Sequence, residues 1–110
     1  MNSISLRPAT HALQATVSVP GSKSYTNRAL LLAALATGVS RLRFASLSND
    51  SEALIKALET LGVSIHKPDS ATLIVEGCGG MLRPYQGTLD VGPAGTTMRF
   101  LATLCAAIPG

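Results

Sequence analysis

An apolar segment at residues 29–36 follows a turn at Pro20-Gly21-Ser22 and limits the possible folds more than any other part of the sequence. Leucine and alanine fill this segment and leave a helix almost no polar face, so we expect the helix to be largely buried. Aromatic residues make up only 4% of the chain, so the core must be built from small aliphatic side chains. Such side chains suit close packing of helices on a sheet, which predicts an α/β (α+β) fold.

The remainder of the chain alternates between strand-like and helix-like segments. Strands are expected at residues 4–6, 15–19, 39–47, 63–67, 72–76 and 88–91, which are short and bounded by turn residues. Helices are expected at residues 25–36 and 53–61 and from residue 96 or 97 to about 107, with Gly38 and Gly62 ending the first two. The order of elements starts over after residue 88, and the last helix has no later strand to lie on. We therefore expect one repeat unit, the start of a second unit and a truncated chain.

Charge and cysteine usage exclude several classes of protein. The net charge is only +3, and no dense run of Lys and Arg marks a nucleic-acid-binding arm. The apolar segments are too short to span a bilayer, and residues 1–5 do not resemble a signal peptide. Cys78 and Cys105 form no CxxC pair, which predicts free thiols in a reducing, cytoplasmic compartment. His11 and His66 match no metal-ligand spacing, so no metal site is expected.

The first candidate binding segment, residues 20–28, joins an expected strand to the apolar helix. Helix N-termini present unpaired N–H groups and a partial positive charge, so they bind phosphates well. Gly21 would let the backbone approach an anion closely. Lys23 adds a mobile charge, while Ser24 and Thr26 add hydroxyl donors. Arg28 can bind a carboxylate or a phosphate through two parallel hydrogen bonds.

Several of these residues also have purely structural interpretations, which the sequence leaves open. Residues 20–28 could be a turn with solvated charges in which Ser24 caps the helix. A P-loop fits poorly, because the first glycine of that motif is missing and Lys23 follows a serine. Asp50 is expected to cap a helix. Cys78 is expected to be a free thiol in a glycine loop, because no basic side chain adjoins it, and Cys105 is expected to lie in the core.

The second candidate segment, residues 92–99, repeats the pattern of a strand that gives way to a helix through glycines and hydroxyls. Gly92 and Gly95 would allow close approach of a ligand, and Thr96 and Thr97 would cap the helix or donate to a ligand. Arg99 could anchor a ligand, but we favour a role as the partner of a buried carboxylate or of loop carbonyls. Two such helix starts in one short chain suggest a pair of substrates that carry phosphates or carboxylates.

The residues of both segments resemble those of one known family. Val19-Pro20-Gly21-Ser22-Lys23-Ser24, followed by Asn27-Arg28 and the apolar run to Ala36, resembles the start of phosphoshikimate enolpyruvyl transferases, or EPSP synthases. The likeness continues through Leu47, Asn49-Asp50-Ser51 and residues 57–63. Gly92 and Ala94-Gly95-Thr96-Thr97-Met98-Arg99 resemble the second glycine loop of the family. The resemblance covers nearly the whole chain in register.

The resemblance implies a fold of two lobes built from repeated β-α-β-α-β-β units, with the substrates in the cleft between the lobes. Residues 1–19 would be a strand segment of the lobe that is completed by the missing C-terminal half. Residues 20–110 would be the first unit of the other lobe and the start of its second unit. The implied reaction transfers the enolpyruvyl group of phosphoenolpyruvate to the 5-hydroxyl of 3-phosphoshikimate and releases phosphate. The resemblance implies no organic cofactor and no metal, a monomer when full length, and inhibition by glyphosate, a larger mimic of phosphoenolpyruvate.

Five site residues follow from the resemblance, position by position. Lys23 matches the lysine that contacts both substrates and is the expected catalytic residue. Ser24 and Arg28 match residues that bind 3-phosphoshikimate. Gly95 and Thr96 match the loop that lies against phosphoenolpyruvate.

Two positions depart from the family, and two other functions remain open. Pro93 stands where the family usually has asparagine and lacks a backbone donor and a side-chain amide, while Phe100 replaces a common proline. One alternative is the related UDP-sugar enolpyruvyl transferase, whose first loop lacks the pattern of Ser24, Asn27 and Arg28. The other is a non-catalytic α/β module that binds phosphorylated ligands. Because the acid and base groups of the family lie outside residues 1–110, we expect this chain to be inactive by itself.

Overall fold

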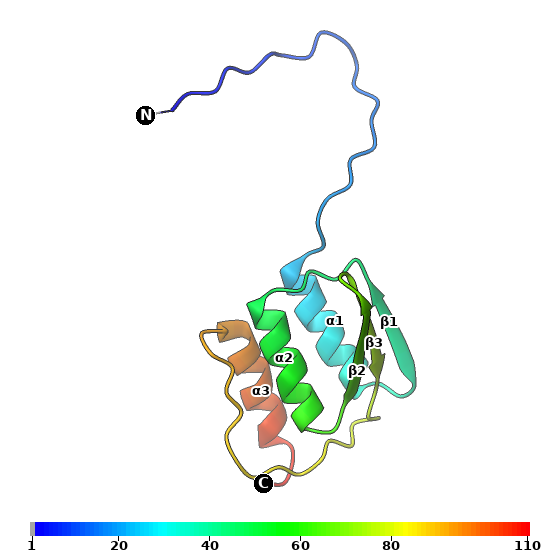
Figure 1. The fold of residues 1–110 in the computed structure, drawn as a ribbon, viewed down its shortest axis with the longest axis vertical. Coiled ribbons are helices and arrows are strands. Elements are labelled where there is room, and N and C mark those ends of the chain that lie inside the picture. The colour runs from blue at the N-terminus through cyan, green and yellow to red at the C-terminus, as the bar shows by residue number, and fades with distance from the viewer. Residues whose placement is uncertain (1) are drawn as a thin grey trace.

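Helices and strands alternate in the computed structural model, which describes residues 2–110. The elements are α1 (Lys23–Leu35), β1 (Val39–Arg43), α2 (Asn49–Thr60), β2 (Ser64–Asp69), β3 (Thr72–Glu76) and α3 (Gly95–Ala106). The order from α1 to β3 is that of the expected repeat unit without its first strand. Figure 1 shows the helices on one side of the sheet, with α2 between α1 and α3. This arrangement confirms the α/β (α+β) class.

The sheet is antiparallel, with the strand order β1-β3-β2. Leu73 and Val75 of the central strand are fully buried against the helices, and Leu42 lies opposite Leu73 on β1. The alternate residue Ile74 pairs with Arg41 and belongs to the other face of the sheet. A sheet with one apolar and one polar face is typical of antiparallel strands that are covered on one side.

The core lies between the sheet and the helices and consists mainly of aliphatic side chains. Leu54, Leu58 and Leu61 form one buried stripe along α2 at the spacing of helix turns, as the sequence predicts. Helix α1 differs from the prediction, because it is buried on only one side. Leu30 is fully buried, but Leu32 is 69% exposed because no described element covers its side of the helix.

Both of the first two helices begin at a serine cap that the sequence analysis misplaced. The cap of α1 is Ser22 rather than Ser24, and its side chain accepts a hydrogen bond from the Tyr25 amide. The cap of α2 is Ser48, whose side chain accepts from the Ser51 amide. Because α1 begins at Lys23, the lysine belongs to the first helical turn rather than to a loop.

Glycines after the helices and strands make the turns between elements. Gly38 and Gly62 have the positive φ angles of 83° and 99° that the sequence predicts after α1 and α2. Gly77 packs against the end of α1, where its amide donates to the carbonyl of Gly38. A Cβ at Gly77 would overlap the carbonyl oxygen of Ala36 and lie 2.7 Å from that of Ala33, so only glycine fits. In the hairpin, the Ala71 amide donates to Asp69 and lowers the pKa of this carboxyl below its usual range.

Three of the expected strands do not form, and one is shorter than expected. Residues 4–6 and 15–19 have no strand partner among residues 2–110, and Figure 1 shows the N-terminal segment extending away from the rest. Residues 88–91 form no strand either, and Asp90 accepts from the Gly92 amide where the chain turns at Gly92-Pro93. Strand β1 ends at Arg43 because Phe44 adopts a φ of 58°, which is incompatible with an extended strand. The assignment of residues 1–19 to a second lobe stays a prediction, and Met1 lies outside the described residues.

Within residues 2–110, none of the helices is both long enough and apolar enough to cross a membrane. Cys78 and Cys105 are both free and half-buried.

Candidate functional site

The starts of the three helices meet around a hollow of about 220 Å³. Its lining comprises Lys23, Ser24 and Asn27 from α1, Asp50 from α2 and Thr96 from α3. Three of the five predicted site residues, Lys23, Ser24 and Thr96, therefore lie around one space although they belong to two distant segments. The structure brings together the two candidate segments that the sequence analysis treated separately.

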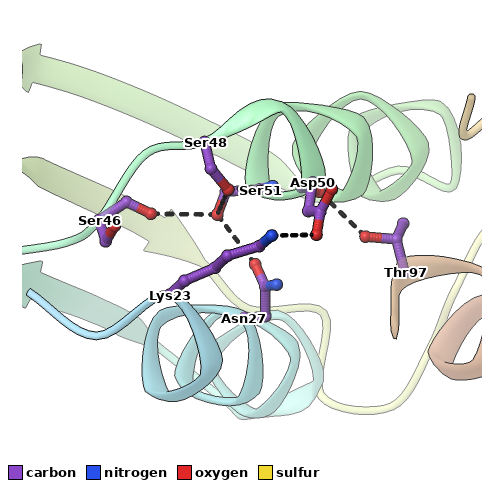
Figure 2. A network of polar contacts seen from close by, with 7 residues as sticks. All are labelled: Lys23, Asn27, Ser46, Ser48, Asp50, Ser51 and Thr97. Carbon is purple, nitrogen blue, oxygen red and sulfur yellow. Dashed lines mark hydrogen bonds and ion pairs between the residues drawn. The ribbon is translucent and has the colours of Figure 1, made fainter. Parts of the chain in front are cut away.

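Lys23 supplies the positive charge of this hollow. Its Nζ lies 2.6 Å from Oδ2 of Asp50, and the two side chains are 55% and 22% exposed (Figure 2). Exposed ion pairs contribute only about 0–1 kcal/mol to stability. Because the ammonium group is the exposed side of this pair, an anionic ligand can compete with Asp50 for it.

Asp50 is the site residue that the sequence analysis missed. We expected it to cap α2, but Ser48 caps the helix and the Asp50 carboxylate is free to pair with Lys23. Its position in the first turn of α2 resembles the position of Lys23 in α1. The segment Asn49-Asp50-Ser51 is also part of the family resemblance, and that signal could have identified it.

A buried polar network joins the start of α1 to the start of α2. The hydroxyl of Ser51 lies 2.9 Å from Oδ1 of Asn27 and 3.1 Å from the carbonyl oxygen of Ser46, and can donate to either (Figure 2). Asn27 is 2% exposed and Ser51 is completely buried. Buried polar groups that satisfy one another hold elements at a defined separation, because breaking them leaves an unpaired group in the core.

Thr26 belongs to the same junction and is not available to a ligand. Its hydroxyl donates to the Ser22 carbonyl at 2.7 Å and accepts from the Ser46 amide at 2.9 Å. The prediction that Thr26 donates to a bound anion is therefore wrong. Gly21 has a similar explanation: a Cβ there would overlap the carbonyl oxygen of Phe44, so this glycine serves packing rather than the approach of an anion.

The two threonines at the start of α3 have different surroundings. Thr96 is exposed and lines the hollow. Thr97 is completely buried, and its hydroxyl donates to the main-chain oxygen of Asp50 at 2.9 Å (Figure 2). Neither threonine caps the helix, because the residue in the cap position is Ala94 and no side chain accepts from the first amides. The amides of this first turn remain unpaired by side chains and face a region where an anion is favourable.

Arg28 and Gly95 do not line the hollow, but both adjoin residues that do. Arg28 is exposed and lies one helical turn after Ser24, so the two share a face of α1. Gly95 is the first residue of α3 and has an ordinary φ, with open space where a Cβ would be. The backbone conformation at position 95 therefore does not require glycine.

Other candidate residues lie apart from the hollow. Arg99 is exposed and forms no ion pair within residues 2–110, so its predicted role as the partner of a buried carboxylate is wrong. Cys105 is half-buried at the edge of the core. His11 and His66 are exposed, and the described part of the chain holds no group of three or more His, Cys, Asp or Glu side chains placed to bind a metal.

The geometry combines one ammonium group, two hydroxyls and the N-termini of α1 and α3, whose first turns carry no acidic residue, around a small, open hollow. Each of these features favours a negatively charged ligand, and the carboxylate of Asp50 already neutralises part of the charge. Such a site suits a phosphate or a carboxylate of a small molecule better than an apolar ligand.

Comparison with known proteins identifies close relatives. The family model for EPSP synthase (3-phosphoshikimate 1-carboxyvinyltransferase) matches residues 8–110. A 3-phosphoshikimate 1-carboxyvinyltransferase of Rhizobium leguminosarum bv. trifolii is 50% identical over 91 residues, which are 83% of this chain and 21% of the relative. The enzyme of the same name from Nostoc punctiforme is 47% identical over 107 residues, which are 96% of this chain and 25% of the relative.

Solved structures agree with the sequence relatives. The EPSP synthase from Acinetobacter baumannii superposes on 80% of this chain with a TM-score of 0.75 and 30% sequence identity. The matched part is 20% of that protein. The chain thus spans between a fifth and a quarter of the length of the relatives it matches.

Proposed function

The chain belongs to the EPSP synthase (3-phosphoshikimate 1-carboxyvinyltransferase) family, and on this premise we propose that residues 20–110 form part of one side of its substrate cleft. The complete enzyme would transfer the enolpyruvyl group of phosphoenolpyruvate to the 5-hydroxyl of 3-phosphoshikimate and release phosphate, a step of the shikimate pathway. The observation that supports this proposal best is the shared hollow of Lys23, Ser24 and Thr96. Two separate anion-binding helix starts at one place suit a reaction between two anionic substrates.

We assign the following roles to the residues around the hollow. Lys23 would contact both substrates and stabilise the negative charge that they bring together. Ser24 and Arg28, which share one face of α1, would bind 3-phosphoshikimate. Gly95 and Thr96, at the start of α3, would lie against phosphoenolpyruvate.

The reaction depends on charge and orientation more than on covalent catalysis by this part of the enzyme. The methylene carbon of phosphoenolpyruvate is protonated, and the 5-hydroxyl attacks the neighbouring carbon. The attacking hydroxyl loses its proton as the new C–O bond forms. Phosphate then leaves from the tetrahedral intermediate as its own C–O bond breaks, and the new methyl group loses a proton, which restores the C=C bond of the enolpyruvyl group. Lys23 and the helix N-termini would hold the two polyanions in reacting geometry, which contributes through proximity and preorganised electrostatics.

The proton donors and acceptors of the reaction would come from parts of the enzyme outside residues 1–110. The proposed enzyme acts in the cytoplasm, a location that the two free cysteines support.

A hybrid enzyme tests the proposal directly. Residues 1–110 replace the matching first quarter of the Nostoc punctiforme relative, to which they are 47% identical. We expect this hybrid enzyme to release phosphate only when both substrates are present. A folded hybrid enzyme that binds neither substrate would contradict the proposal and would favour a binding module for other phosphorylated ligands.

A further inference from the structure

We propose that Thr97 is a positioning residue that fixes Asp50, and through it Lys23, relative to Thr96. The effect on catalysis rests on the proposed function, whereas the mechanical link can be tested without it. Thr97 does not line the hollow, and its buried side chain is held away from any ligand there. Its influence must therefore pass through the residues that it contacts.

The link is a chain of contacts that crosses three helices. Thr97 directly follows Thr96, which lines the hollow. The hydroxyl of Thr97 donates to the Asp50 main-chain oxygen at 2.9 Å, and the Asp50 carboxylate lies 2.6 Å from Lys23 Nζ. Figure 2 shows Asp50 between the other two residues, with one contact on each side. The starts of α3, α2 and α1 are thereby connected in series.

The bond from Thr97 is not needed to satisfy the Asp50 carbonyl. That carbonyl lies in the first turn of α2, where an amide one turn further along the helix already donates to it. A carbonyl oxygen has two lone pairs and can accept a second hydrogen bond. The main consequence of the Thr97 hydrogen bond is therefore that it places α3 against α2. The Asp50 carbonyl oxygen would have a hydrogen-bond partner without it.

The next residue along α2 forms the corresponding link to α1. Ser51 bonds to Asn27, which lies one turn after Lys23 on the same face of α1. Consecutive residues at the start of α2 thus hold the two neighbouring helices, Asp50 holding α3 and Ser51 holding α1. The site is assembled around this point, so loss of the Thr97 link leaves α3 free to shift against the other two helices.

The first test measures the link in the 110-residue chain by NMR. Thr97→Val removes the hydroxyl while keeping the shape, and we expect it to shift the ε-methylene signals of Lys23, to which Thr97 has no hydrogen bond. Thr97→Ser restores the donor and should return these signals to their original positions. Thr103→Val is the matched control, because Thr103 donates only within α3, to the Arg99 carbonyl. Unchanged Lys23 signals in Thr97→Val, or equal shifts in Thr103→Val, would overturn the proposal.

The second test measures the catalytic consequence in the hybrid enzyme. A misplacement of about 1 Å can cost about 100-fold in rate, so we expect Thr97→Val to lower kcat/KM about 10- to 100-fold. Thr97→Ser should retain most of the activity, and Thr103→Val should be unaffected. Thr97→Ala, which removes the same hydroxyl, is measured in parallel, and melting temperatures are recorded for all variants. A loss of activity that arises only from poor packing of the valine side chain can then be recognised.

A double-mutant cycle separates positioning from a general structural effect. If Thr97 acts through Asp50, the losses caused by Thr97→Val and Asp50→Asn should not add in the double variant. Additive losses would show that Thr97 acts by another route and would overturn the proposal. If the unmutated hybrid enzyme releases no phosphate, the proposed function fails, while the Lys23 signals still decide whether the link exists.

Discussion

Lys23 and Asp50 both line the hollow and carry opposite charges, and the more exposed of the two is the lysine. Asp50 is held by its main chain, whereas Lys23 has a long, flexible side chain that can move between the carboxylate and a ligand. The ammonium group is therefore the mobile partner, and we expect it to follow the bound anion.

Lys23→Met in the hybrid enzyme should abolish measurable turnover while the fold survives. The substitution keeps the side-chain length and removes the charge that faces both substrates. Loss of a donor that stabilises the transition state typically lowers kcat by about 100- to 1000-fold. Steady-state kinetics and the melting temperature are measured for this variant and for Lys56→Met, an exposed lysine on α2 that does not line the hollow. Near-normal kcat/KM in Lys23→Met would show that Lys23 is only a solvated surface charge.

Gly95→Ala should weaken inhibition by glyphosate more than it weakens binding of phosphoenolpyruvate. A Cβ at Gly95 meets no atom of the chain within 4 Å, and the φ of Gly95 is compatible with alanine. The added methyl group would therefore intrude only on a ligand. A methyl group in a tight site costs about 10- to 200-fold in discrimination, and glyphosate is the larger occupant.

The melting temperature of Gly95→Ala separates this steric explanation from a backbone effect. We expect it to stay unchanged or to rise slightly, because alanine restricts the unfolded chain. Equal losses for both ligands, together with a lowered melting temperature, would show that the glycine is needed for the turn.

At the scale of the elements, the site depends on how the ends of the helices are held. Ser22 and Ser48 cap α1 and α2, and the glycine segment after β3 closes the far end of α1. The amides of Cys78 and Gly79 donate to the carbonyls of Ala34 and Ala36, which a helix C-terminus otherwise leaves unpaired. The contacts with the end of α1 give Gly77 and Gly79 a structural role and involve Cys78 only through its main-chain amide.

Gly77→Ala should destabilise the chain, because the new methyl group would overlap the carbonyl oxygen of Ala36. Overpacking of this kind typically costs about 1–3 kcal/mol. In a domain of this size, each kcal/mol lowers the melting temperature by about 4–8 °C. Gly95→Ala is the matched control, since it makes the same chemical change where space is open. Equal melting temperatures for the two variants would contradict the packing that we describe around Gly77.

The whole molecule combines a packed unit with a segment that packs on nothing. The radius of gyration is 18.5 Å, whereas a compact chain of 110 residues would have about 13 Å. Ile4, Leu6 and Leu13 in the extended segment are 84–86% exposed, and Leu32 on α1 is also largely exposed. The chain spans at most a quarter of the length of its relatives, and apolar side chains exposed in this way are typical of surfaces that another protein segment covers.

The 110-residue chain should therefore not make enolpyruvylshikimate phosphate by itself. It holds Lys23 and the two helix starts, but the proposed acid and base groups lie outside it. Phosphate release is measured with the purified chain and both substrates, and a sample without protein sets the background. Turnover well above that background would refute the expectation and would place the whole reaction within residues 1–110.

Features that depend on neighbouring residues could be predicted from the amino-acid sequence. The presence of α2, the positive φ angles of Gly38 and Gly62 after the first two helices, and the hairpin of β2 and β3 were predicted correctly, whereas α2 begins four residues before the expected start. Helix hydrogen bonds, turns and caps are local, so periodicity and glycine placement define them well. The resemblance also identified the family, because the residues around both glycine loops are specific.

Features that depend on residues far apart in the sequence became visible only in the folded chain. Strands at 4–6, 15–19 and 88–91 were predicted wrongly for this chain, because alternation cannot show whether a pairing strand is present. Thr96 and Thr97 are adjacent residues of the same type, so the sequence predicted for both that they cap the helix or donate to a ligand. Packing instead buries Thr97 against Asp50 and leaves Thr96 facing the hollow. The ion pair of Lys23 and Asp50 joins two helix starts that only the folded chain brings together. Side-chain pairs of this kind depend on how whole helices and strands pack, and this packing cannot be predicted from the pattern of neighbouring residues.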